Sequence, residues 1–134
     1  MVNRKKIDAL LKSANEALLK KEIVKDGIVE DGYDSAIAAF GPSVVQSGLM
    51  PAMAFYCAKK SEEKRKTDKA IVIDAIALTL SSKYGKYNHK ELFKFCLENY
   101  NNRSIGEKLM TDIVNASVAL KIMVRTYKIP ENHE

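Results

Sequence analysis

The sequence predicts an all-α fold, a compact bundle of about six or seven helices that ends in a long C-terminal helix. Three observations favour this fold. The 134 residues suffice for one hydrophobic core, so we treat 1–134 as a single helical domain. Apolar residues recur at spacings of three and four through most of the chain, which is the period of an α-helix. Only one apolar run, residues 70–80, also suits a β-strand, and no comparable second run is available to pair with it.

The first predicted helix covers about residues 3–25. Lysines near its end suit the negative pole of the helix dipole, and Gly27 can terminate it. Its apolar side chains are spaced so that they share one face: Ile7, Leu10, Leu11, Ala14, Ala17 and Leu18.

Residues 33–59 contain several turn signals and predict short, kinked helices. Asp34 can cap the second helix, which carries Ala36, Ile37 and Phe40. Gly41-Pro42 then interrupts the helical pattern, because proline fits best in the first turn of a new helix. We expect Gly48 to end that third helix and Pro51 to open a fourth, which runs to about residue 59.

The middle of the chain alternates charged and apolar segments. Residues 59–69 form a charged linker, for which a loop or a solvated helical turn is expected. Residues 70–80 are apolar on nearly all sides and longer than a usual strand, which predicts a helix at the centre of the bundle. Gly85 can end it, and Asn88 to Glu91 resembles a capping box for the next helix.

The last helix has the clearest pattern. Ser104 and Glu107 have the spacing of a capping box, and Pro130 ends the helix before a polar tail at 129–134. The heptads are too few for a long coiled coil, so we predict a bundle helix. Its apolar residues recur at spacings of four and three: Leu109, Ile113, Ala116, Leu120, Met123 and Tyr127.

Catalytic and metal-binding motifs are missing from the sequence. Cys57 and Cys96 are flanked by apolar or aromatic residues, which indicates buried thiols more than a redox pair or a metal half-site. No Walker loop, zinc-protease motif or nucleophile elbow occurs. We therefore expect no enzyme activity, no cofactor and no metal. Apolar stretches fall short of the ~20 residues of a membrane helix and no secretion signal is recognised, so we expect a cytoplasmic chain without a membrane partner.

The positive charge is unevenly distributed. The net charge is +5, and the linker 59–69 alone holds six bases and three acids. Such a segment suits phosphate contacts, although cations of this kind also serve solubility alone. A second basic group follows a helical spacing near the end of the last helix. The candidate nucleic-acid-binding residues are Lys59, Lys60, Lys64, Arg65, Lys66, Lys69, Lys121, Arg125 and Lys128.

Two further nucleic-acid interpretations are weaker. Residues 83–90 interleave lysines with tyrosines, as a stacking platform for single strands would, but tyrosines at helix ends more often anchor packing. A helix-turn-helix is disfavoured as well, because the segments 43–47 and 52–55 are too apolar to lie in a DNA groove.

One stretch resembles a known family. Residues 45–56 contain Ser47-Gly48-Leu49 followed by Ala52-Met53-Ala54-Phe55. This is similar to the hallmark of the small all-helical subunit of type III-B CRISPR effector (Cmr) complexes, in which a polar-Gly-Leu helix end precedes an Ala-x-Ala-Phe helix. The expected helix at 33–40, the apolar middle helix and the heptad-patterned last helix fit the same plan.

The resemblance implies a non-catalytic subunit with macromolecular partners. Members of this family stack along the backbone subunits of an RNA-guided interference complex, beside the guide–target duplex. The implied partners are the other Cmr complex subunits, guide RNA, target RNA and further copies of the chain, while cleavage and nucleotide chemistry belong to other subunits. Lysines and arginines would hold target-strand phosphates and base pairing would choose the sequence. The alternatives are a type III-A small subunit, a stand-alone nucleic-acid-binding module or a protein-interaction module.

Overall fold

The computed structural model describes residues 3–58 and 67–130. This part of the chain forms seven helices and one short antiparallel hairpin, so the predicted all-α bundle with a long last helix is confirmed. The elements, in chain order, are α1 (Arg4–Lys20), β1 (Val24–Lys25), β2 (Ile28–Val29), α2 (Tyr33–Ser47), α3 (Leu49–Cys57), α4 (Lys69–Thr79), α5 (Ser81–Tyr84), α6 (His89–Asn99) and α7 (Arg103–Val124).

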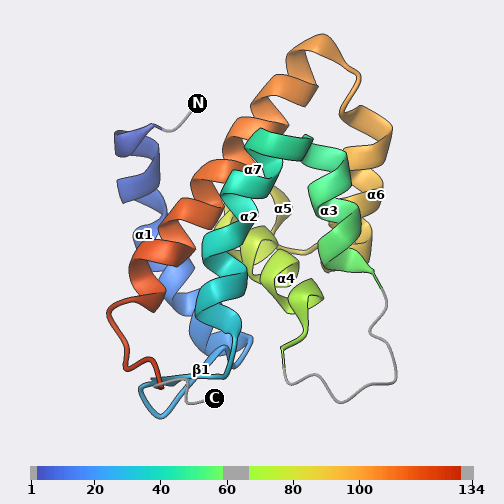
Figure 1. Ribbon diagram of the computed structural model, residues 1–134. Helices are drawn as coiled ribbons and strands as arrows, with labels where there is room; N and C mark the ends of the chain where they lie inside the picture. Colours follow the sequence, from blue (N-terminus) through green and yellow to red (C-terminus); the bar gives the residue numbers. More distant parts are fainter. Residues whose placement is uncertain (1–2, 59–66, 131–134) are drawn as a thin grey trace.

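Helix α4 lies at the centre of the bundle, as its apolar sequence predicts. It contacts α1, α2, α3, α6 and α7 (Figure 1). Most of its side chains are fully buried, among them Val72, Ile73 and Ile76. The Asp68 carboxylate caps its first turn by accepting the Ala70 N–H at 3.1 Å. Even with this apolar centre, no helix in the described ranges has both the length and the apolar character needed to cross a bilayer.

The first helix is shorter than predicted and is followed by a hairpin. Helix α1 ends at Lys20, because Glu22 and Asp26 adopt positive φ angles of 60° and 54° and turn the chain back. Val24 then pairs with Val29, and both are buried against the core. Strands of two residues carry no periodicity, so the sequence pattern could not reveal this hairpin.

The predicted break at Gly41-Pro42 is wrong. Helix α2 continues through Pro42 to Ser47, and its N-cap is Gly32 rather than Asp34. A proline within a helix removes one backbone hydrogen bond, but buried anchors on both sides of Pro42, Phe40 and Val44, hold the helix against α4 and α7. After α2, Gly48 turns the chain at a φ of 95°, as predicted, and α3 begins with Pro51 in its first turn.

The two following helices are capped by asparagines. The capping box predicted at the start of α6 is confirmed, since Asn88 and Glu91 bond reciprocally. The box predicted at Ser104 is wrong: Asn102 caps α7, and its Oδ1 accepts the N–H groups of Ser104 and Ile105 at 3.1 and 3.0 Å. Helix α7 ends at Val124, earlier than the Pro130 that was expected to stop it.

The two ends of the described chain are joined to each other. Helix α7 packs along α1, and the Tyr127 hydroxyl donates to Oδ1 of Asn15. Beyond α7, the Lys128 N–H donates to the Gly27 carbonyl at 3.0 Å, and its carbonyl accepts the Val29 N–H at 2.8 Å. The C-terminal segment therefore lies against the N-terminal hairpin at the lower end of the molecule in Figure 1.

Gly106 provides a test of the corner between α6 and α7. A Cβ atom at this buried position would lie 2.3 Å from the backbone oxygen of Tyr100, and backbone cannot move aside cheaply. We predict that Gly106→Ala lowers the free energy of unfolding by about 1–3 kcal/mol through this overlap. Urea denaturation followed by circular dichroism measures the change.

Gly41→Ala is the matched control. It also replaces a helical glycine, but its nearest contact, Ser117 Oγ at 3.5 Å, is an ordinary one. Alanine has a higher helix propensity than glycine, which stabilises the helix, but Pro42 disfavours helical backbone angles at a preceding residue with a Cβ atom. These effects oppose each other, so we expect a free energy of unfolding within about 1 kcal/mol of the wild-type value. Equal losses in the two variants would contradict the role assigned to the corner.

Candidate nucleic-acid interface

The predicted phosphate contacts divide into three sets. Five of them, Lys59, Lys60, Lys64, Arg65 and Lys66, lie outside the described residues. Lys69 is the first residue of α4, and the remaining three surround the end of α7.

Lys69 is held against aromatic rings. Its Nζ lies 4.4 Å from the centroid of the Phe55 ring and 5.5 Å from that of Tyr56. Phe55 is 63% exposed, so the cation–π contact lies at the surface, where it contributes about 0.5–1 kcal/mol. The contact orients the ammonium group beside α3.

The three basic residues near the end of α7 do not form the predicted helical stripe. Lys121 is half-buried in the last turn, Arg125 is the C-cap, and Lys128 lies in the extended segment beside β2. The prediction from spacing is wrong here because the helix ends at Val124. Whether these cations contact phosphate stays a prediction.

Sequence patterns missed a second basic cluster, in a cleft among α1, α5 and α7 of about 370 Å³ that we name the lysine cleft. Lys6, Lys83 and Lys108 line it, and each comes from a different helix. Lys6 and Lys108 also line an adjoining shallow cleft of about 490 Å³. No local spacing connects these lysines, so only the packing of α1 against α7 reveals them. The other residues of the lysine cleft are Ala9, Leu10, Leu80, Ser82, Asp112 and Asn115.

One of these lysines is fixed by an ion pair. Lys83 Nζ lies 3.0 Å from Oδ2 of Asp112, whose side chain is only 11% exposed. The hydrogen bond to Asp112 raises the pKa of Lys83, which keeps the ammonium charged. Within the described part, Lys6 and Lys108 form no ion pair. Three cations against one carboxylate leave the lysine cleft electropositive.

The aromatic residues of segment 83–90 serve packing, as predicted. The rings of Tyr84, Tyr87 and Phe95 lie 5.5 to 6.1 Å apart, centroid to centroid. All three are partly buried against the core. They pack against one another in tilted arrangements, which favours their role as anchors over a platform for bases.

Three residues of a type used in nucleophilic catalysis meet among α3, α4 and α6. The N–H and Nδ1 of His89 both contact Oδ1 of Asp74, at 2.5 and 3.1 Å. Cys57, however, donates to the backbone oxygen of His89 and not to the ring. Burial raises the pKa of Cys57 to about 12, and that of fully buried Cys96 also to about 12. A protonated thiol is a poor nucleophile, so this cluster links helices instead of activating sulfur.

Metal-ligand clusters are also missing from the region that the structure covers, since no group of three His, Cys, Asp or Glu residues is placed to hold an ion there.

The exposed large apolar side chains lie mostly at two ends of the molecule. In Figure 1 the α2–α3 junction and the α6–α7 corner lie at one end, and a cleft lined by Leu49, Pro51 and Tyr100 joins them. The hairpin and the C-terminal ends of α1 and α7 lie at the opposite end. We name these the head and tail surfaces. Their exposed apolar residues are Val45, Leu97, Tyr100 and Ile105 at the head, and Leu19, Ile28, Ile122 and Ile129 at the tail.

Comparison with known proteins gives one match. A family model described as CRISPR-associated protein (Cas_Cmr5) matches residues 10–120, which is most of the chain. Neither the curated proteins nor the solved structures yield a match.

Because both thiols are largely buried and protonated, we predict that they react slowly with thiol reagents and that they make the stability of the fold depend on pH. We expect Cys57 and Cys96 of the native chain to react with DTNB at pH 8 at least about tenfold more slowly than in guanidinium chloride. Because their folded pKa of about 12 exceeds the ordinary 9.0, the native state keeps protons that the unfolded state loses. The contribution of these two thiols to stability is therefore fully present below pH 9 and is lost as the pH rises towards 12.

The control for the thiol prediction is the double variant Cys57→Ala/Cys96→Ala. It should lose less stability than the wild type between pH 9 and 12, measured by urea denaturation at each pH. Rapid labelling of the native thiols would contradict the burial assigned to them.

Proposed function

This chain belongs to the Cas_Cmr5 family, the small subunits of type III-B CRISPR (Cmr) complexes, and we propose that it stacks head to tail within the complex and holds RNA there. Family membership implies partnership with the other Cmr complex subunits. It favours this assignment over a type III-A subunit, a stand-alone nucleic-acid-binding module and a protein-interaction module.

The observation that carries the stacking proposal is the separation of the exposed large apolar residues, apart from Phe55, into a head and a tail surface. The two surfaces consist of different residues from different elements. A contact between unlike surfaces is heterologous, and such contacts repeat into open stacks instead of closing into a pair. A stack of this kind suits a subunit that follows an extended backbone assembly.

The RNA contacts that we propose go to phosphates and not to bases. Lys69 is oriented by Phe55 at the edge of the linker, and Arg125 and Lys128 are exposed near the tail surface. Phosphate contacts fix position without selecting sequence, and guide–target pairing supplies the sequence choice. The raised pKa values of Cys57 and Cys96 support a role without nucleophilic chemistry.

Stacking is tested by blocking one surface at a time. Tyr100→Glu introduces a charge at the head and Ile28→Glu at the tail, where the native side chains are 45% and 41% exposed. We predict that the purified wild type forms oligomers of increasing size at high concentration, and that each variant alone stays monomeric in sedimentation velocity. An equimolar mixture of the two variants should form dimers and nothing larger, because one intact head meets one intact tail.

Lys12→Gln is the control for this test, since it changes the charge by the same amount on an exposed face of α1. It should behave like the wild type. If either single variant self-associates like the wild type, the head-to-tail arrangement is wrong.

RNA binding is tested on the assembled complex in a salt series. Replacing Lys64, Arg65 and Lys66 by Gln should weaken RNA retention. The negative slope of log affinity against log salt should also become less steep, by about 0.7 for each phosphate that these residues no longer neutralise. The corresponding variant of Lys121, Arg125 and Lys128 tests the second group in the same filter-binding assay.

A triple variant of exposed α1 and α6 lysines, Lys12, Lys90 and Lys94 to Gln, controls for net charge, because these residues lie outside the head and tail surfaces and the candidate set. Its slope should match that of the wild type. If the salt dependence of this variant became as shallow as that of the two other triple variants, only overall charge would matter. The assignment of the phosphate contacts to particular residues would then be wrong.

A further inference from the structure

Asn115 carries an unpaired buried donor. It lies in the middle of α7 and is 1% exposed. Its Oδ1 accepts the Asn3 backbone N–H at 3.3 Å, which fixes the other end of the amide as nitrogen. Among the described residues, Nδ2 of Asn115 is the buried side-chain atom left without a hydrogen-bond partner. Such a group lowers the stability of the fold, so its presence calls for an explanation.

The lysine cleft supplies that explanation, because Asn115 is part of its wall. Lys6, Lys83 and Lys108 line the same cleft, and their ammonium groups are all donors. The carboxylate of Asp112 is already paired with Lys83 at 3.0 Å. The donors of this cleft therefore suit a ligand that supplies hydrogen-bond acceptors, and its excess of cations favours an anion.

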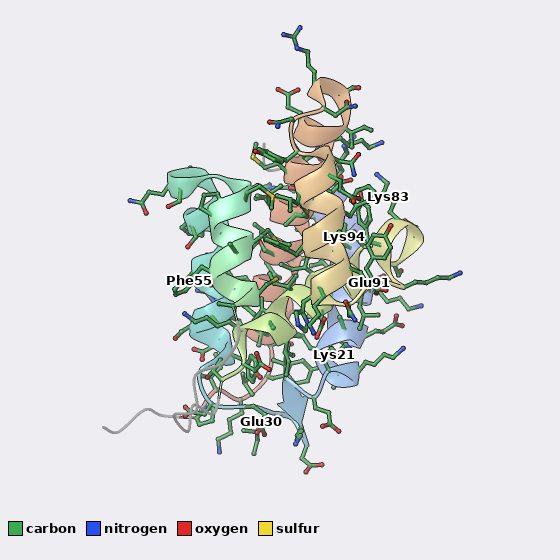
Figure 2. All side chains as sticks on the ribbon, turned by 90° about the vertical axis from the view of Figure 1, so that its right-hand side faces the viewer. Lys21, Glu30, Phe55, Lys83, Glu91 and Lys94 are labelled. Carbon is green, nitrogen blue, oxygen red and sulfur yellow. The ribbon has the colours of Figure 1, made fainter. Side chains whose placement is uncertain are left out.

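The shape of the cleft limits the anion further. Its volume of about 370 Å³ falls within the range of about 300–1,000 Å³ typical of small-molecule sites. Ala9, Leu10 and Leu80 give it an apolar wall, against which a sugar or base can pack. It is separate from the contact of Lys69 with Phe55, since Figure 2 shows Lys83 and Phe55 on opposite sides of the molecule.

We propose that the lysine cleft binds the phosphate group of a nucleotide. Lys6 and Lys108 neutralise the charge of the phosphate, and Lys83 is held in place by Asp112. Nδ2 of Asn115, which is fully covered in the free protein, donates to a phosphate oxygen when the side chains over it move aside. The nucleotide is either a residue of bound RNA, in which case the proposal rests on the proposed function, or a free mononucleotide.

The test is a titration of the ¹⁵N-labelled full chain, followed by the side-chain amide signals of Asn115. The probes are inorganic phosphate, AMP and a single-stranded RNA of ten nucleotides, each at an ionic strength held constant with sodium chloride. We expect a saturable shift of these signals with at least one probe and none with chloride alone. A response to AMP identifies a free nucleotide site, and a response to RNA alone identifies an RNA phosphate. If no probe shifts the Asn115 amide, the proposal is overturned.

Matched lysine variants distinguish specific binding in the lysine cleft from general electrostatic attraction between the protein and the anion. Lys6→Gln/Lys108→Gln and Lys12→Gln/Lys20→Gln remove the same charge, but only the first pair lines the lysine cleft. We expect an affinity loss of about tenfold or more for the first pair and less than about twofold for the second. Equal losses would overturn the proposal.

Asn115→Leu tests the amide itself. If Nδ2 serves a ligand, the variant should fold with a melting temperature at or above that of the wild type, because an unpaired donor is removed. The probe that raises the melting temperature of the wild type should then leave that of the variant unchanged. An equal rise in both would overturn the proposal, and the lysine variants decide if Asn115→Leu does not fold.

The outcomes are independent of the proposed function. Absence of phosphate binding, together with normal self-association and RNA retention, would remove the cleft proposal alone. Phosphate binding by a chain that neither stacks nor retains RNA would remove the proposed function alone.

Discussion

The fold depends on α4, a central helix that is buried on nearly every side. Because it has almost no polar face of its own, the helices packed around it must contribute apolar side chains to cover it. Asp74 is the charged residue in the middle of α4, and its two contacts with His89 orient the start of α6. Once the interior is filled in this way, charged groups and potential binding groups are restricted to the periphery, where the head surface, the tail surface and the lysine cleft lie.

The sequence predicts well what depends on local periodicity. The α-helical period and the capping box at Asn88 define most helices, because these signals act within a few residues. Predictions fail where packing overrides a local signal. Pro42 should break a helix, but Phe40 and Val44 anchor α2 on both sides of it. Asn102 caps α7 although Ser104 shows the more familiar pattern.

The candidate sites also divide into those that are visible in the sequence and those that form only when the helices pack. Runs of charge such as residues 59–69 are visible in the sequence, and so is the spacing of Lys121 and Arg125. The lysine cleft is not visible, since Lys6, Lys83 and Lys108 meet only when α1, α5 and α7 pack together. The head and tail surfaces are also products of packing, because each combines residues from distant parts of the chain.

The joining of the two chain ends has a consequence for biosynthesis. Of the described helices, α1 is synthesised first and its partner α7 last. The hydrogen bond between Asn15 and Tyr127 can therefore form only after α7 has been synthesised. Such contacts of high sequence separation close late in folding. The tail surface combines α1 and the hairpin with the end of α7, so a nascent or truncated chain does not present it complete. In the stack that we propose, only chains synthesised beyond α7 would therefore offer a complete tail surface to a neighbour.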